Sequence, residues 1–201
     1  MILPRRRWLG FALVAVAAFV VGTRDLVAQE VIDVKAAAYL RDRYLADMDT
    51  VHVKIMALAN AIPADKYAWR PAQGVRSVSE VLMHVASEWL FYGPQSVGAK
   101  PPADFGAPQQ TLPKLEKDFT TKPQVLEQLT KGWAYYVAQM QAVDAAKLTG
   151  RYPPWNTTLA EAAFGMTGDQ HEHLGQLISY ARSVGVVPPG AGDADDALPH
   201  R

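Results

Sequence analysis

The chain has 201 residues, balances 20 Lys and Arg against 20 Asp and Glu, and contains no cysteine. This length fits one domain. The lack of cysteine excludes a disulfide framework, a thiolate metal site, a lipid-modified cysteine anchor and a cysteine nucleophile. Lys and Arg form no basic patch along the sequence, so we expect no nucleic-acid partner.

The N-terminus has the pattern of a secretory signal peptide. The basic run Arg5 to Arg7 precedes an apolar stretch that ends at Gly22, and Ala28 is a small residue at a suitable cleavage point. The apolar stretch is shorter than the roughly 20 residues that span a bilayer. We therefore predict a signal peptide over residues 1–28 and an exported protein, periplasmic or extracellular. An uncleaved membrane anchor is the alternative interpretation.

The first two predicted helices have clear start and stop signals. A helical pattern runs from Val31 to Ala61 with an apolar stripe on one face, and Pro63 follows it. The sequence from Ser77 to Glu80 is a capping box, because the serine hydroxyl can bond a free amide while the glutamate reaches back. This box predicts a second helix that continues to about Tyr92.

A long break separates these helices from the next. Residues from Gly93 to Pro113 include five prolines and three glycines, which predicts a loop or crossover rather than a packed element. A third helix is expected from Thr121 to near Val143, with a proline tolerated in its first turn. A second proline-rich turn follows over residues 150–155.

The last predicted helix opens at another capping box, from Thr158 to Glu161, and runs to about Val184. The domain is predicted over residues 29–189, followed by a flexible tail over residues 190–201. No segment shows convincing alternation with a period of two. Four helices of similar length with a long crossover predict an all-α fold, specifically a four-helix bundle.

The fourth helix carries a concentration of polar residues. Asp169 and His173 are spaced i, i+4 and project about 40° apart on an ideal helix, so they can share one metal ion. His171 projects about 200° from Asp169, nearly the opposite way. Gln170 and Glu172 are expected to face solvent or a neighbouring helix.

The second helix carries a matching pair, since His84 and Glu88 are also spaced i, i+4. The simpler interpretation is a buried histidine that is satisfied by a carboxylate. Two helices with such pairs favour a metal site instead, because burying several ionisable groups without a purpose is costly. Helical bundles build metal sites from side chains on facing helices.

These motifs resemble the DinB-like superfamily, also called YfiT-like metalloenzymes. The resemblance spans about Val31 to Pro189. The residues that carry it are Trp69-Arg70-Pro71, the segment from Glu80 to His84, and the segment from His171 to Arg182.

The resemblance implies a four-helix bundle of up-down-down-up topology, often dimeric, with zinc or nickel bound by three histidines. The second-helix histidine corresponds to His84 and one last-helix histidine to His173. The remaining family histidine is replaced by Asp169. A carboxylate can still bind a divalent ion. The alternatives are a degenerate site, or a site in which His171 takes over through a local distortion.

The sequence thus predicts a metal-dependent hydrolase or transferase that acts on an unknown small molecule. The predicted metal ligands are His84, Asp169 and His173. Glu88 is the candidate general base or orienting group, and Gln176 is the candidate for holding a substrate oxygen. One alternative is a non-catalytic bundle that binds a small ligand or partner. Metal binding for structure or sequestration is the other.

Overall fold

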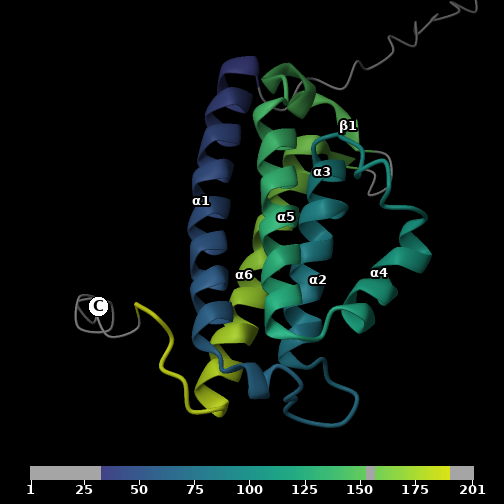
Figure 1. Ribbon diagram of the computed structural model, residues 1–201. Helices are drawn as coiled ribbons and strands as arrows, with labels where there is room; N and C mark the ends of the chain where they lie inside the picture. Colours follow the sequence, from purple (N-terminus) through teal and green to yellow (C-terminus); the bar gives the residue numbers. More distant parts are fainter. Residues whose placement is uncertain (1–32, 153–156, 191–201) are drawn as a thin grey trace, which may run out of the picture.

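Long helices packed side by side make up most of the described structure (Figure 1). The computed structural model describes residues 33–152 and 157–190. Within these ranges the helices of thirteen or more residues are α1 (Val34–Ala61), α2 (Val78–Leu90), α5 (Lys122–Gln141) and α6 (Leu159–Ser183). The all-α prediction is confirmed. The predicted signal peptide and the tail beyond residue 190 lie outside the described residues.

The predicted starts of the second and the last helix are confirmed by their caps. The backbone N–H of Glu80 donates to the Ser77 hydroxyl over 3.3 Å, and the Glu80 carboxylate accepts from the Ser77 N–H over 2.6 Å. The same reciprocal arrangement joins Thr158 and Glu161 at the start of α6. Local sequence therefore sets where the helices that carry the candidate site begin.

The long helices contact one another as a closed ring. Helix α1 packs against α5 and α6, and α2 packs against the same two helices. Lys122, at the start of α5, donates to the carbonyl oxygens of Asn60 and Ile62 at the end of α1. Tyr180, near the end of α6, donates to the carbonyl oxygen of Arg76 just before α2. In each of these two pairs the helices therefore run in opposite directions.

Helix α2 is the most deeply buried of the four, with ten of its thirteen residues buried. Its neighbours α5 and α6 cover two sides, and α4 (Pro108–Asp118) covers a third. The largest wholly buried side chains of the core are Trp89, Tyr67, Tyr136, Met48 and Ile55. A polar side chain on α2 is therefore shielded from water wherever α4 or α6 lies over it.

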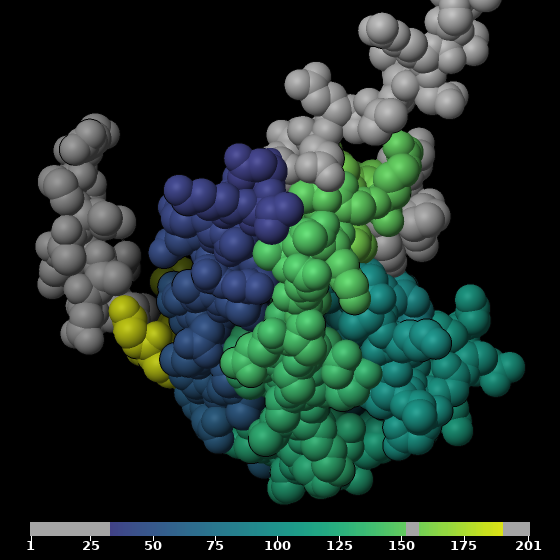
Figure 2. Space-filling view, turned by 90° about the horizontal axis from the view of Figure 1, so that it is seen from above, coloured from purple at the N-terminus to yellow at the C-terminus, as the bar shows by residue number. Residues whose placement is uncertain are grey.

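The segment between α2 and α5 differs from the prediction. Instead of an unpacked loop, it contains α3 (Tyr92–Ser96) and α4. The ring of Phe105 stacks on Phe91 at 5.5 Å, which holds the crossover against the end of α2. Pro108 occupies the first turn of α4, where its missing N–H costs nothing. Figure 2 shows this segment as a bulge on the side of the molecule.

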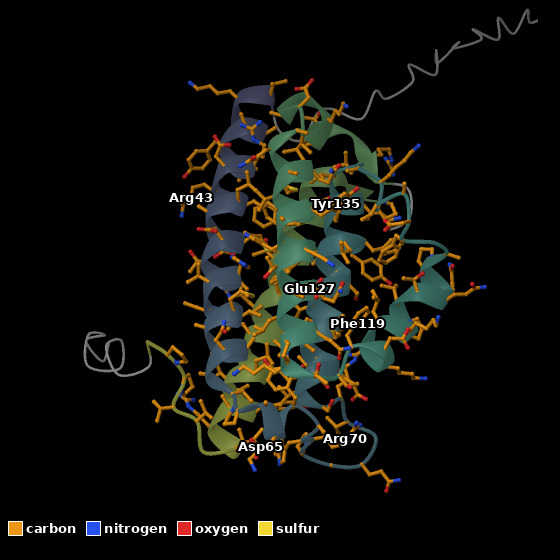
Figure 3. The ribbon with its side chains drawn as sticks, in the orientation of Figure 1. Arg43, Asp65, Arg70, Phe119, Glu127 and Tyr135 are labelled. Atoms are coloured by element: carbon orange, nitrogen blue, oxygen red, sulfur yellow. The ribbon has the colours of Figure 1, made fainter. Side chains whose placement is uncertain are left out.

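Short elements complete the structure. Two 3-10 turns, η1 (Ala64–Lys66) and η2 (Ala145–Thr149), follow α1 and α5. Strand β1 (Arg151–Tyr152) pairs antiparallel with β2 (Thr157–Thr158) where the sequence predicts a turn. Phe119, just after α4, packs against the core (Figure 3). In the described ranges, no helix combines the length and apolar character needed to cross a membrane.

Helix α5 passes unusually close to α2 at Gly132. A β-carbon there would lie 2.9 Å from the carbonyl oxygen of Ala86. We predict that Gly132→Ala lowers the free energy of unfolding by about 1–3 kcal/mol, because two helix backbones must separate. Gly168→Ala is the matched control, since nothing lies within 4 Å of that β-carbon position. It should leave stability unchanged or raise it by up to about 1 kcal/mol. Urea unfolding followed by circular dichroism measures both, and equal effects would contradict the close approach.

Candidate metal centre

Two imidazoles and one carboxylate meet between α2 and α6. Nε2 of His84 lies 3.1 Å from Oε1 of Glu88, and Nε2 of His173 lies 3.5 Å from the same oxygen. One ligand atom from each of the three residues lies within 4.8 Å of the other two. His84, Glu88 and His173 therefore form a group that can hold a metal ion.

The group is largely shielded from water. The Glu88 side chain is 6 % exposed, that of His173 13 % and that of His84 22 %. The i, i+4 spacing puts His84 and Glu88 one helical turn apart on α2, on the face that meets α6. A carboxylate and imidazoles in a protected position suit a divalent ion with three protein ligands and an open position.

The outward-facing ring nitrogens of both histidines have partners. Nδ1–H of His84 donates to Oε1 of Glu116 over 3.0 Å, and Nδ1–H of His173 donates to Oε1 of Gln176 over 3.4 Å. Each contact fixes the imidazole tautomer that leaves Nε2 free for a metal. Nε2 of His173 is buried and makes no hydrogen bond to any described residue. The residues present thus fit a bound metal ion.

Glu116 is a site residue that sequence reasoning missed. It lies on α4, where its carboxylate also pairs with Arg76 over 3.0 Å. Neither the spacing of Glu116 nor any motif around it signals a role, because its proximity to His84 depends on how the crossover packs against α2. The carboxylate restrains the His84 ring and links the crossover to the site.

The three residues perturb one another's protonation strongly. Burial opposes a charge on Glu88, but the neighbouring imidazoles of His173 and His84 outweigh it and lower the pKa of Glu88 to about 2. Burial likewise opposes a charge on His84, yet its bonds to Glu116 and Glu88 raise the pKa of His84 to about 9. The pKa of His173 is raised as well, mainly by Glu88 against the opposing effect of burial. Without a metal, the cluster holds an ionised Glu88 carboxylate beside a protonated His84 imidazole at neutral pH.

Asp169 lies at the edge of the cluster. Its Oδ2 is 3.6 Å from Nε2 of His173, and its side chain is 43 % exposed. Burial and the neighbouring Glu88 raise the pKa of Asp169 to about 6. With Glu88, Tyr92 and Met166, it lines a cavity of about 300 Å³ beside the cluster. Its role as a metal ligand stays a prediction. The third member of the group that can hold a metal ion, beside His84 and His173, is Glu88.

The structure places His171 away from the cluster, as the helical projection predicts. Its side chain is half exposed, and its Nε2 lies 3.0 Å from Oδ2 of Asp47 on α1. Helix α6 is continuous through this region, without the local distortion that would turn His171 inward. His171 therefore does not complete the site.

Two glutamines of α6 contact the cluster. Gln176 lies between His173 and Tyr180, and its Nε2 donates to the Tyr180 hydroxyl over 3.0 Å. Its predicted contact with a substrate stays a prediction. Gln170 is wholly buried against α2 and donates to Oε2 of Glu88 over 2.5 Å. It faces a neighbouring helix, which is one of the two orientations expected from the sequence.

The protonation of His84 predicts a pH dependence for the metal-free protein. Because folding raises the pKa of His84 from 6.5 to about 9, its contribution to stability is complete below pH 6.5 and is lost as the pH rises through about 9. The lowered pKa of Glu88 acts only below pH 4.5. We expect the free energy of unfolding in chelator to fall between pH 6.5 and 9.5.

Urea titrations of the wild type and of His84→Ala at both pH values measure this effect. The decrease should be larger in the wild type, since His84→Ala lacks the imidazole whose pKa folding raises to about 9. An identical decrease in the two proteins would show that the carboxylates of Glu88 and Glu116 do not stabilise the protonated form of His84.

Comparison with known proteins supports the family resemblance. The family model of the DinB superfamily matches residues 47–177, which include His84, Glu88 and His173. A comparison with curated proteins finds no match.

Proposed function

Because the chain belongs to the DinB superfamily, we propose that it is an exported metalloprotein that acts as a metal-dependent hydrolase or transferase on a small molecule. In this proposal His84, Glu88 and His173 hold a divalent ion, with zinc and nickel as the candidates. Support for export comes from the signal-like pattern of the first 28 residues.

The proposal includes a four-helix bundle of up-down-down-up topology. The support is the ring of α1, α5, α2 and α6, in which α1 and α6 run in one direction and α2 and α5 in the other (Figure 1). The crossover with α3 and α4 is what allows α2 and α5 to run the same way. We also propose a homodimer, which rests on the family resemblance alone.

One observation carries the proposal. Nε2 of His173 is buried without a hydrogen bond, and it faces the same Glu88 oxygen as Nε2 of His84. A buried ring nitrogen without a partner costs free energy unless something else satisfies it. A metal ion between the three ligand atoms would satisfy it and would balance the Glu88 charge.

The chain's own residues suggest how the site works. A bound divalent ion would supply Lewis acidity and lower the pKa of a water in the open position. Glu88, with a pKa of about 2, is a weak base, so a ligand role suits it better than the general-base role predicted from sequence. Asp169, with a pKa of about 6 in the metal-free protein, faces the cavity and can accept a proton there. Because α2 and α6 bury the cluster, a small molecule can reach it only from the side of this cavity.

Metal content tests this assignment. Protein purified without chelator and supplied with zinc or nickel should hold about one ion per chain, and His84→Ala should lose it because one of three ligands is gone. Asp169→Asn should keep the ion, because Asp169 lies outside the group of three ligands. His171→Ala is the control and should keep it too. Full metal retention in His84→Ala, measured by elemental analysis, would contradict the assignment.

A second cavity favours a second candidate function, the binding of a small apolar ligand. This cavity of about 240 Å³ lies between α1 and α6, and its lining is mainly apolar, including Leu40, Tyr44, Met140, Ala163 and Phe164. A cavity of about 150 Å³ holds benzene, so this one suits a ligand of about ten heavy atoms.

The rim of this cavity indicates the ligand's charge. Arg43 lies there, on the outer side of α1 (Figure 3), and no hydrogen bond or ion pair joins it to another described residue. Asp47, also at the rim, is already paired with His171. An unpaired guanidinium beside an apolar cavity suits a carboxylate with a short hydrocarbon chain.

Octanoate is the probe for this second candidate. We expect calorimetry to show binding that weakens about tenfold in Arg43→Gln, which lacks the charged hydrogen bond. Ala163→Phe should abolish binding by filling the cavity, while Val53→Ala, at an exposed position elsewhere on α1, is the control. Unchanged binding in Ala163→Phe would place the ligand elsewhere.

A further inference from the structure

Gln170 occupies a position where an amide side chain needs an explanation. It is 0 % exposed, between α6 and α2, among apolar neighbours of the core. Its Oε1 accepts from Nε1–H of Trp89 over 2.8 Å, and its Nε2 donates to Oε2 of Glu88 over 2.5 Å. Burying an amide is costly unless it is hydrogen-bonded, and these two bonds satisfy it at both ends.

The direction of the Gln170 amide follows from its partners. An indole N–H can only donate, so the side-chain oxygen of Gln170 must face Trp89. The amide nitrogen is then left facing Glu88, and it can only donate to that carboxylate. Trp89 thus determines which end of the Gln170 amide reaches the metal cluster. Trp89 and Glu88 are neighbours on α2, whereas Gln170 lies on α6. The two hydrogen bonds of Gln170 therefore join the two helices that build the site.

The hydrogen bond from Gln170 gives the two carboxylate oxygens of Glu88 different partners. Oε2 is occupied by the Gln170 amide, while Oε1 faces Nε2 of His84 and of His173. We propose that Gln170 is a positioning residue, oriented by Trp89, that holds Oε2 of Glu88 and leaves Oε1 facing the metal. This inference rests on the proposed metal site and adds residues that neither the family resemblance nor the sequence spacing indicates.

A purely structural role for Gln170 makes a different prediction. Leucine has a similar volume and would fill the same space, so Gln170→Leu would then change stability but not the affinity of the folded protein for a metal. A positioning role predicts an affinity loss of about 10- to 100-fold, typical for removing a group that orients a metal ligand. It also predicts that the freed carboxylate binds through both oxygens.

Competition with a chromogenic chelator measures zinc affinity, at a temperature where every variant is folded. We expect about a 10- to 100-fold loss in Gln170→Leu. Trp89→Phe should show a smaller loss, because the Gln170 amide still donates to Glu88 but its oxygen loses the Trp89 N–H that anchors it. Tyr67→Phe is the control: it removes a buried hydrogen bond, from the Tyr67 hydroxyl to the carbonyl oxygen of Ala59, away from the site. It should keep wild-type affinity.

Cobalt absorption spectra supply a second readout. A second carboxylate oxygen raises the coordination number, so the visible bands of cobalt-loaded Gln170→Leu should weaken and shift from those of the wild type. Trp89→Phe serves the same purpose if Gln170→Leu fails to fold. Its unchanged affinity and spectrum would overturn the positioning role.

The outcomes separate the two proposals. If wild-type protein binds neither zinc nor cobalt, the proposed metal function fails, and this inference with it. If the wild type binds both and Gln170→Leu binds equally well with an unchanged spectrum, the metal site stands and the positioning role of Gln170 is wrong. A loss of affinity in Gln170→Leu and Trp89→Phe, but not in Tyr67→Phe, supports both.

Discussion

The buried carboxylate of Glu88 is the constraint on which the rest of the structure depends. A charge at a position that is 6 % exposed must be met by several donors, since the desolvation cost of an ion is several kcal/mol. The groups that face the carboxylate come from both helices: His84 from α2, and His173 and Gln170 from α6. Helices α2 and α6 therefore have to keep one register along their contact, and α4 has to cover the site. The position of the crossover is tied to this requirement through Glu116.

The helices themselves could be predicted from sequence because their signals are local. A capping box such as Ser77–Glu80 acts over four residues, and the stop at Pro63 acts over two or three. The i, i+4 pairs are local in the same way. That is why the sequence could identify His84 and His173 as cluster members and could predict that His171 faces elsewhere.

The remaining features depend on contacts between distant segments. Glu116 reaches His84 only because Phe105 and Phe91 hold the crossover against α2. The direction of each α6 side chain around the helix axis could be predicted from the sequence, but not how deeply each is buried. Gln170 is wholly buried, whereas Asp169, one residue earlier, lies at the cavity edge. The relative roles of Glu88 and Asp169 follow from that depth. Sequence spacing treats the two carboxylates alike, whereas packing makes one of them a buried ionised group and the other a base near neutrality.

The most direct test of this account is to locate the ion in crystals of the zinc-loaded protein by anomalous scattering at the zinc absorption edge. The account predicts one anomalous peak per chain, bonded to Nε2 of His84, Nε2 of His173 and a single oxygen of Glu88. Distances should be near the ~2.0–2.2 Å usual for zinc with nitrogen and oxygen ligands. A peak bound instead by Asp169 or His171 without Glu88, or no peak between α2 and α6, would contradict it.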